Sequence, residues 1–225
     1  MSAELAASDH TARITREAVT RVLSAHAKLY RWRTPDYQTA MLQDLALLWR
    51  GHHPTLLDLG GGTGVMAEAI KTLLPVDRVT SIDVTDRFIR TLTVKTMVYD
   101  GRRLPFSSAS FDAATINNVL HHVPVSDRMA LMAEVCRVVS GPIYIKDHIA
   151  RSRLDHWRLT ALDAIGNIPF GGQVRAAYLS LEDWQSLAAS CGRQLTVKDG
   201  GAYRKGVMAR LFQNRLEAVF RLDAP

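Results

Sequence analysis

The apolar positions of the chain change their spacing near residue 54. Between residues 11 and 50 they recur at the three- and four-residue spacing of amphipathic helices, in two segments that Thr34, Pro35 and Asp36 separate. We therefore predict helices before residue 54, attached to whatever the rest of the chain forms.

From residue 54 onward, short apolar runs alternate with helix-like patterns. The strand-like runs are TLLDLG (55–60), VTSIDV (79–84), VKTMVYD (94–100), FDAATINNV (111–119) and PIYIKDHI (142–149). The helix-like segments between them are VMAEAIKTLL (65–74), DRFIRTL (86–92) and DRMALMAEVCRVV (127–139). Such alternation is typical of right-handed βαβ units, which build a largely parallel sheet with helices on both faces.

The last third of the chain is less regular. Residues 151–165 have a helical pattern and GNIPFGG (166–172) has the composition of a loop. Ser180 is placed to cap a helix that Gly192 ends. QLTVKD (194–199) and LEAVFRL (216–222) then predict a closing antiparallel pair of strands at the edge of the sheet.

These elements predict one α/β domain over residues 1–225, with a doubly wound, mostly parallel, seven-stranded sheet. We divide it into N-terminal helices that act as a cap (1–53), a ligand-binding core (54–150), and lid-like helices with the closing strands (151–225). The apolar fraction of 47% in 225 residues is sufficient for one sizeable core.

Charge and cysteine content exclude few classes of function. The chain has 28 basic and 22 acidic residues and a net charge of +6, but the basic residues are scattered, so we do not expect a nucleic-acid partner. Cys136 and Cys191 both fall in helix-like patterns, which argues against a disulfide scaffold or a zinc site and favours a reducing, cytoplasmic compartment. No run is apolar enough to predict a signal peptide or a membrane span.

The segment LLDLGGGTG (56–64) places a glycine-rich loop directly after a buried strand. Sheets of this kind bind ligands outside the carboxyl ends of their strands, and glycine lets a ligand approach the backbone closely. A dinucleotide fingerprint would need glycine where Val65 stands, and a phosphate-binding P-loop would need a lysine. Asp58 would repel phosphate but could hold an ammonium group, so the loop favours a nucleoside that carries an amino acid.

Three motifs together resemble class I S-adenosylmethionine-dependent methyltransferases. LLDLGGGTG is similar to the first motif of that family, and SIDVTD (81–86) places Asp83 at the end of the next strand, 25 residues beyond Asp58. The third motif, VYDGRRLPFSSASFDAATINNVLHHV (98–123), resembles the small-molecule group that includes the ubiquinone and menaquinone C-methylating enzymes. The resemblance covers about residues 55–150 and implies the Rossmann-like methyltransferase fold.

The resemblance also implies a cofactor, S-adenosylmethionine, and a role for individual residues. Asp58 would lie near the amino group of the cofactor, and Asp83 would accept the ribose hydroxyls, with Val84 against the adenine. Asp100 would accept the adenine amine beside the Gly101 backbone. The remaining contacts would come from the glycine loop and from the end of the fourth strand: Gly60, Gly61, Gly62, Gly64, Asn117 and Asn118.

Methyl transfer from a sulfonium mainly requires alignment and exclusion of water, and a base only where the acceptor must lose a proton. His148 is our first candidate for that base and His122 the second, while we expect a structural role for at least one residue of the His121–His122 pair. Asp147 and His148 are strand neighbours, so they are expected to point to opposite faces. We expect no metal ligands, because the acidic residues that the metal-dependent catechol-type methyltransferases use are absent.

Contacts to the acceptor should come from aromatic and polar side chains outside the shared core. The aromatic candidates are Tyr30, Trp32, Tyr37, Trp157, Phe170, Tyr178 and Trp184, and the polar candidates are Asn167 and Arg175.

The predicted function is methyl transfer to oxygen or carbon of a small metabolite, with a homodimer as one possible assembly. An RNA or protein methyltransferase is the alternative, but the fourth strand is followed by N-N-V-L (117–120) and not by the N-P-P-Y type of motif used on base amines. A protein that uses or binds the cofactor without transferring a methyl group is the second alternative.

Overall fold

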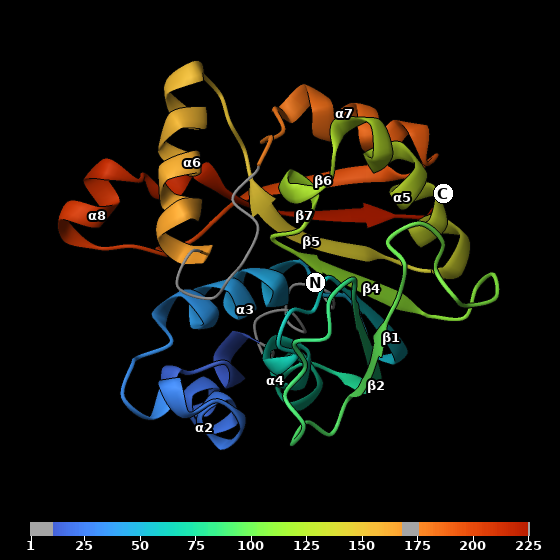
Figure 1. Cartoon of the computed structure of the whole chain (residues 1–225), viewed down its shortest axis with the longest axis horizontal. Helices are drawn as coiled ribbons and strands as arrows, with labels where there is room; N and C mark the ends of the chain where they lie inside the picture. Colours follow the sequence, from blue (N-terminus) through green and yellow to red (C-terminus); the bar gives the residue numbers. More distant parts are fainter. Residues whose placement is uncertain (1–10, 168–175, 225) are drawn as a thin grey trace.

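A seven-stranded sheet runs through the middle of the molecule in the computed structural model, which describes residues 11–167 and 176–224 (Figure 1). The strand order is β3-β2-β1-β4-β5-β7-β6. Strands β1 to β5 pair in parallel, whereas β7 is antiparallel to both β5 and β6. The strands are β1 (His53–Leu59), β2 (Val76–Asp83), β3 (Lys95–Val98), β4 (Ala113–Asn117), β5 (Ile143–His148), β6 (Gln194–Asp199) and β7 (Glu217–Asp223).

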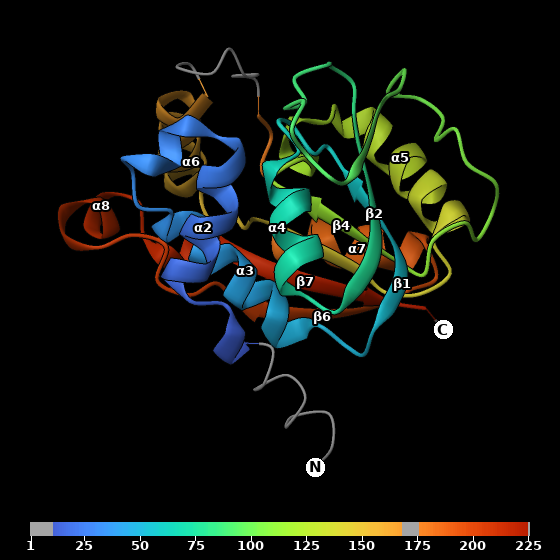
Figure 2. The same cartoon turned by 90° about the horizontal axis from the view of Figure 1, so that it is seen from below.

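Helices cover both faces of this sheet, and each face has its own apolar core. On one face lie α2 (Arg16–His26), α3 (Asp36–Leu48) and α4 (Val65–Leu73), and on the other α5 (Val125–Val138) and α7 (Leu181–Ser190). Figure 2 shows α6 (Arg153–Asn167) and α8 (Gly206–Leu211) at one end of the molecule. The sequence prediction of a doubly wound, mostly parallel sheet with an antiparallel edge and N-terminal helices is confirmed.

The chain reverses its direction of travel across the sheet between β1 and β4. From β1 it proceeds outward through β2 to β3, and it then returns to place β4 on the other side of β1. A crevice forms at the carboxyl ends of the strands at such a point, because the loops that follow β1 and β4 leave in opposite directions.

The predicted cap of the helix after residue 179 is present. The Ser180 hydroxyl accepts a hydrogen bond from the Asp183 amide at 3.1 Å, and the Asp183 carboxylate accepts one from the Ser180 amide at 2.8 Å. The helix ends before Gly192, which has a φ of 62°.

The prediction of a helix over DRFIRTL (86–92) is wrong. This connection between β2 and β3 is irregular, and its apolar side chains pack on the glycine loop instead of forming a helical face. Phe88 is buried beside Gly64, and the Ile89 amide donates a hydrogen bond to the Thr63 carbonyl at 3.0 Å. The helix-like spacing therefore reflects packing against a loop.

Among the described residues, none of the helices combines the length and the apolar composition that crossing a bilayer requires. The division of the chain into a cap, a core and a lid within one domain stays a prediction. Most of the predicted GNIPFGG loop lies outside the described residues.

Candidate active site

A cavity of about 780 Å³ opens at the carboxyl ends of β1, β2 and β4, at the reversal point of the sheet. Its wall is formed by the segments that follow β1, β2, β3 and β4 and by the first turns of α5. The structure brings six of the predicted site residues together in this wall: Gly60, Asp83, Val84, Gly101, Asn118 and His122. Sequence reasoning missed several others, among them Thr85, Arg87, Tyr99, Arg102 and Asp127.

The glycine loop is tightly enclosed by the protein itself. A Cβ atom on Gly61 would lie 1.8 Å from the Ser81 hydroxyl oxygen, and one on Gly60 would lie 2.4 Å from a methyl group of Val119. Gly60 also has a φ of 73°, a conformation that side chains disfavour. Glycine is therefore required at these two positions by the close packing of the loop between β2 and β4.

Asp83 lies at the cavity wall with its carboxylate fixed by two backbone amides. One oxygen accepts from Gly62 at 2.8 Å and the other from Thr85 at 3.0 Å. Arg87 lies 3.7 Å from the same carboxylate. These contacts bring the glycine loop and the end of β2 together at a single anionic group in the cavity wall.

Asp58 is buried within the sheet and does not line the cavity. The parallel register places Ser81 of β2 and Thr115 of β4 directly beside it, and their hydroxyls donate to its carboxylate at 2.7 and 2.9 Å. Burial raises the pKa of this carboxyl. The predicted contact with an amino group stays a prediction, and the contacts that the structure shows tie β1 to its two neighbours.

The segment after β3 contributes backbone and aromatic surface to the cavity. Val84 lies against Gly101, and its side chain is 51% exposed in the cavity wall, unusually open for a residue at the end of a buried strand. Asp100 is exposed, and its carboxylate accepts from the amides of Arg102 and Arg103, which lowers its pKa. Tyr99 lies between the two acids, and burial together with the charge of Asp83 raises its pKa to about 12.

Only the second asparagine after β4 lines the cavity. Asn118 has a left-handed backbone with a φ of 55°, and its amide group contacts the Tyr37 hydroxyl and the Lys146 ammonium. Asn117 is the last residue of β4, and neither its amide nitrogen nor its amide oxygen has a hydrogen-bond partner among the described residues. A buried amide without partners costs free energy unless a ligand supplies them.

A buried ionic network lies behind Asn118. The ammonium group of Lys146, in β5, is fully buried and contacts the Tyr37 hydroxyl and the Glu217 carboxylate. Arg204 contacts the other oxygen of Glu217. Burial alone would raise the pKa of Glu217, but the charges of Lys146 and Arg204 and the hydrogen bond from His148 hold it well below its ordinary range.

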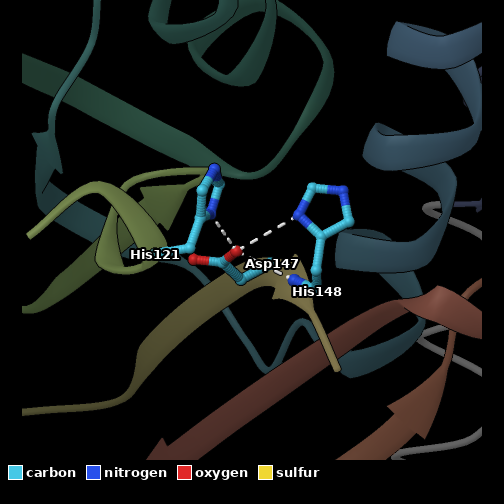
Figure 3. Close-up of side chains that lie close together, drawn as sticks. All are labelled: His121, Asp147 and His148. Atoms are coloured by element: carbon cyan, nitrogen blue, oxygen red, sulfur yellow. Dashed lines mark hydrogen bonds and ion pairs between the residues drawn. The ribbon is translucent and has the colours of Figure 1, made fainter. Parts of the chain in front are cut away.

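Two histidines flank the carboxylate of Asp147 at the ends of β4 and β5 (Figure 3). His121 Nδ1 bonds to Asp147 Oδ1, and His148 Nδ1 lies 3.4 Å from the same oxygen. Lys146 and His148, two residues apart in β5, both contact Glu217, whereas the carboxylate of Asp147 bonds to His121. This arrangement agrees with the alternation expected in a strand, although the Asp147 carboxylate also comes near the His148 ring.

The structure separates the three histidines by environment. His122 lines the cavity, whereas His121 and His148 are buried beside Tyr178, at ring distances of 5.2 and 5.7 Å. The predicted aromatic residues divide into buried and exposed ones. Tyr37, Tyr178 and Trp184 are buried or half-buried, while Trp32 and Trp157 are exposed; Phe170, Arg175 and the side chain of Asn167 lie outside the described residues.

Comparison with known proteins identifies the domain that carries this cavity. Residues 57–141, which contain the glycine loop, Asp83 and both asparagines, match the model of a family described as a methyltransferase domain. This part of the chain is thus similar to a methyltransferase domain. Its finer likeness to the quinone C-methylating group has no support in these comparisons and stays a prediction. The sequence has no significant match among curated proteins.

Solved structures with the same fold as the methyltransferase domain include two that contain S-adenosylhomocysteine. Magnesium protoporphyrin IX methyltransferase (ChlM) from Synechocystis PCC 6803, with bound SAH, is 14% identical with a TM-score of 0.60, over 88% of this chain and 87% of that one. The DhpI–SAH complex is 18% identical with a TM-score of 0.58, over 93% and 97%. A chain from a Haloferax volcanii complex that contains the Trm112 methyltransferase activator is 13% identical with a TM-score of 0.67, over 93% and 97%.

Proposed function

We propose that this chain transfers a methyl group from S-adenosylmethionine to an oxygen or carbon atom of a small metabolite. The observation that carries the proposal is the cavity at the reversal point of the sheet, where Asp83 is presented beside the glycine loop in a matched methyltransferase domain. Its volume of about 780 Å³ falls within the usual range of small-molecule sites.

The residues present fit a nucleoside that carries an amino acid. An acceptor-only carboxylate at Asp83 suits a pair of ribose hydroxyls, and the open apolar side chain of Val84 suits the face of a base.

In this proposal the chain holds and orients the cofactor, which supplies a methyl group already activated on a positively charged sulfur. Gly60 and Gly62 present backbone to the ligand, while Gly61 and Gly64 keep the loop packed. Asp83 and Val84 hold the ribose and the adenine, and Gly101 and Asp100 approach the adenine edge. We place the acceptor beside Asn118 and His122, which also line the cavity.

The acceptor is a small molecule in this proposal, which the nucleoside-sized cavity supports better than a nucleic acid or a protein. The two described cysteines are free, as the proposed cytoplasmic setting requires. A homodimer and a base role for His148 or His122 stay predictions. Of these two histidines, His122 is the one that lines the cavity.

Calorimetric titration with S-adenosylhomocysteine tests the cofactor site. We expect micromolar binding by the unaltered protein and a loss of about 10- to 100-fold in Asp83→Ala, because hydrogen bonds to a charged group contribute about 1.5–3 kcal/mol. Asp86→Ala is the matched control, since Asp86 is three residues away, half-exposed and paired with Arg90 at the surface. It should bind within twofold of the unaltered protein.

Absence of binding by the unaltered protein would remove the proposal. Equal losses in the two variants would show that the effect of Asp83 is not local. Where binding is observed, radiolabelled methyl transfer to a panel of hydroxylated and enolisable metabolites, with transfer RNA and a protein extract as competing acceptors, identifies the acceptor class.

A further inference from the structure

We propose that His121, Asp147 and His148 bind one divalent metal ion of the zinc type. The three residues each offer one ligand atom, and these atoms all lie within 4.8 Å of one another (Figure 3). Two imidazoles and one carboxylate make up a donor set that zinc and similar ions accept, and three protein ligands leave a further position open.

The argument begins with the tautomer of His148. Its Nε2 atom lies 3.2 Å from Oε2 of Glu217, whose two carboxylate oxygens also contact Lys146 and Arg204. A carboxylate oxygen accepts hydrogen bonds, so the N–H group of this contact is on Nε2 of His148. The lone pair of His148 then lies on Nδ1.

That lone pair faces a second negative group. His148 Nδ1 is buried, has no hydrogen-bond partner among the described residues, and lies 3.4 Å from Oδ1 of Asp147. Two electron-rich atoms at that separation repel each other in a buried site unless a cation lies between them. Metal–ligand bonds of about 2.0–2.2 Å at a tetrahedral angle separate two ligand atoms by roughly 3.4 Å.

The surroundings of the cluster resemble those of metal sites in a further respect. Histidine ligands usually donate their other ring N–H to a carboxylate, which fixes the ring and raises its basicity, and Glu217 stands in that position for His148. Asp147 is itself oriented by the amide of Leu120, which donates to its second oxygen at 3.1 Å.

The cluster adjoins the cavity, since His122 follows His121 directly and lines the wall. An ion there would polarise an acceptor oxygen, a role that rests on the proposed function. The binding of the ion does not rest on it. This proposal also departs from the sequence analysis, which predicts no metal ligands, because His121 lies 26 residues from Asp147 and meets the Asp147–His148 pair only in the folded chain.

Metal binding is tested on the purified full chain after treatment with EDTA and dialysis. Titration with ZnCl₂ should give one ion per chain with micromolar or tighter affinity, and Asp147→Asn and His148→Gln should each weaken it by at least about 100-fold. His52→Gln is the matched control, because its imidazole is exposed and pairs with Asp77 at the surface. Its zinc affinity should be unchanged.

Cobalt gives an independent readout of the same site. CoCl₂ added to the EDTA-treated protein should produce visible absorption bands of a four- or five-coordinate site, which His121→Gln and His148→Gln abolish and His52→Gln retains. Titration of the metal-free protein with S-adenosylhomocysteine tests the cofactor site separately, so failure of one proposal is distinguished from failure of the other.

Three outcomes would overturn the metal site. The first is the absence of stoichiometric zinc binding by the unaltered protein, which would mean that a proton occupies the space between His148 and Asp147. The second is equal zinc affinity in His148→Gln and the unaltered protein. The third is loss of the zinc and cobalt signals in His52→Gln. If circular dichroism shows that Asp147→Asn does not fold, His121→Gln and His148→Gln test the metal site in its place.

Discussion

The two sides of the cavity are built in different ways. The glycine-loop side, residues 56–103, is made of consecutive segments that follow β1, β2 and β3, and it presents backbone amides and one carboxylate. The buried-network side consists of Tyr37, Asn118, Lys146, His148 and Glu217, which come from four separate elements or connections and contact one another. Of these residues Asn118 lines the cavity, and the others lie behind it.

This difference shows which kind of site can be built from residues that are far apart in the sequence. A loop that wraps a ligand with its backbone needs a fixed order of glycines, so its parts must be adjacent in sequence. A network of ionised side chains needs only that its members meet in space, but each member depends on the others, because an unpaired charge in the interior is very costly.

The largest effect should come from breaking the network at its centre. Glu217→Gln leaves Lys146 and Arg204 without the carboxylate between them, and we expect it to lower the free energy of unfolding by about 3–5 kcal/mol. Urea denaturation measures the loss. Asp86→Asn, which breaks an exposed pair with Arg90, should cost at most about 1 kcal/mol. Similar losses in the two variants would contradict the contrast between a buried network and the surface.

An intermediate effect should follow from crowding the glycine loop. Gly61→Ala places a methyl group 1.8 Å from the Ser81 hydroxyl and 2.7 Å from the Asp58 carboxylate, so we expect a loss of about 1–3 kcal/mol and weaker binding of S-adenosylhomocysteine. Denaturation and calorimetry measure both. Gly51→Ala is the control: its φ is 66°, but nothing lies within 4 Å of the new methyl group, so it should cost about 1 kcal/mol without affecting binding. Normal binding by Gly61→Ala would show that the loop adjusts.

The smallest effect is expected in the pH dependence of the free energy of unfolding, through the contact of Glu134 with the loop that contains Leu104. Hydrogen bonds from Arg137 lower the pKa of Glu134 to about 2, and the same carboxylate accepts from the Leu104 amide. A carboxyl whose pKa is depressed in the folded state stabilises the protein above its unfolded pKa, and this contribution is lost as the pH falls from about 4.5 toward 2. We expect a contribution of about 1 kcal/mol.

Denaturation curves between pH 7 and pH 2.5 measure this contribution. Glu134→Gln should lower stability at pH 7 and reduce the decline of stability below pH 4.5. The two proteins should become equally stable at the acid end. A constant difference between them at every pH would mean that Glu134 acts through packing and not through its charge.

Much of the fold and of the glycine-loop side could be predicted from the sequence. The strand QLTVKD coincides with β6, and Gly60, Asp83, Val84 and Gly101 meet in one wall, because the carboxyl ends of parallel strands share an edge. The failure at DRFIRTL has a local cause. Apolar residues at helical spacing can also cover a loop, and periodicity alone does not distinguish the two environments.

The buried-network side could not be predicted from the sequence, for a different reason. Tyr37 and Glu217 lie 109 and 71 residues from Lys146, so no local pattern joins them. One signal was available, since Lys146 interrupts the apolar run PIYIKDHI, and a lysine in a buried strand requires a carboxylate partner. The sequence does not reveal which of the 22 acidic residues provides it.

The position of β7 has a consequence for the order in which the molecule can fold. This strand lies between β5 and β6, so the interior of the sheet is completed by a late segment of the chain. Until Glu217 arrives, β5 is an open edge that carries an unneutralised lysine. A ribosome-bound chain would therefore expose an aggregation-prone strand until β7 is synthesised, with the charges of Lys146 and Asp147 as protection against wrong pairing.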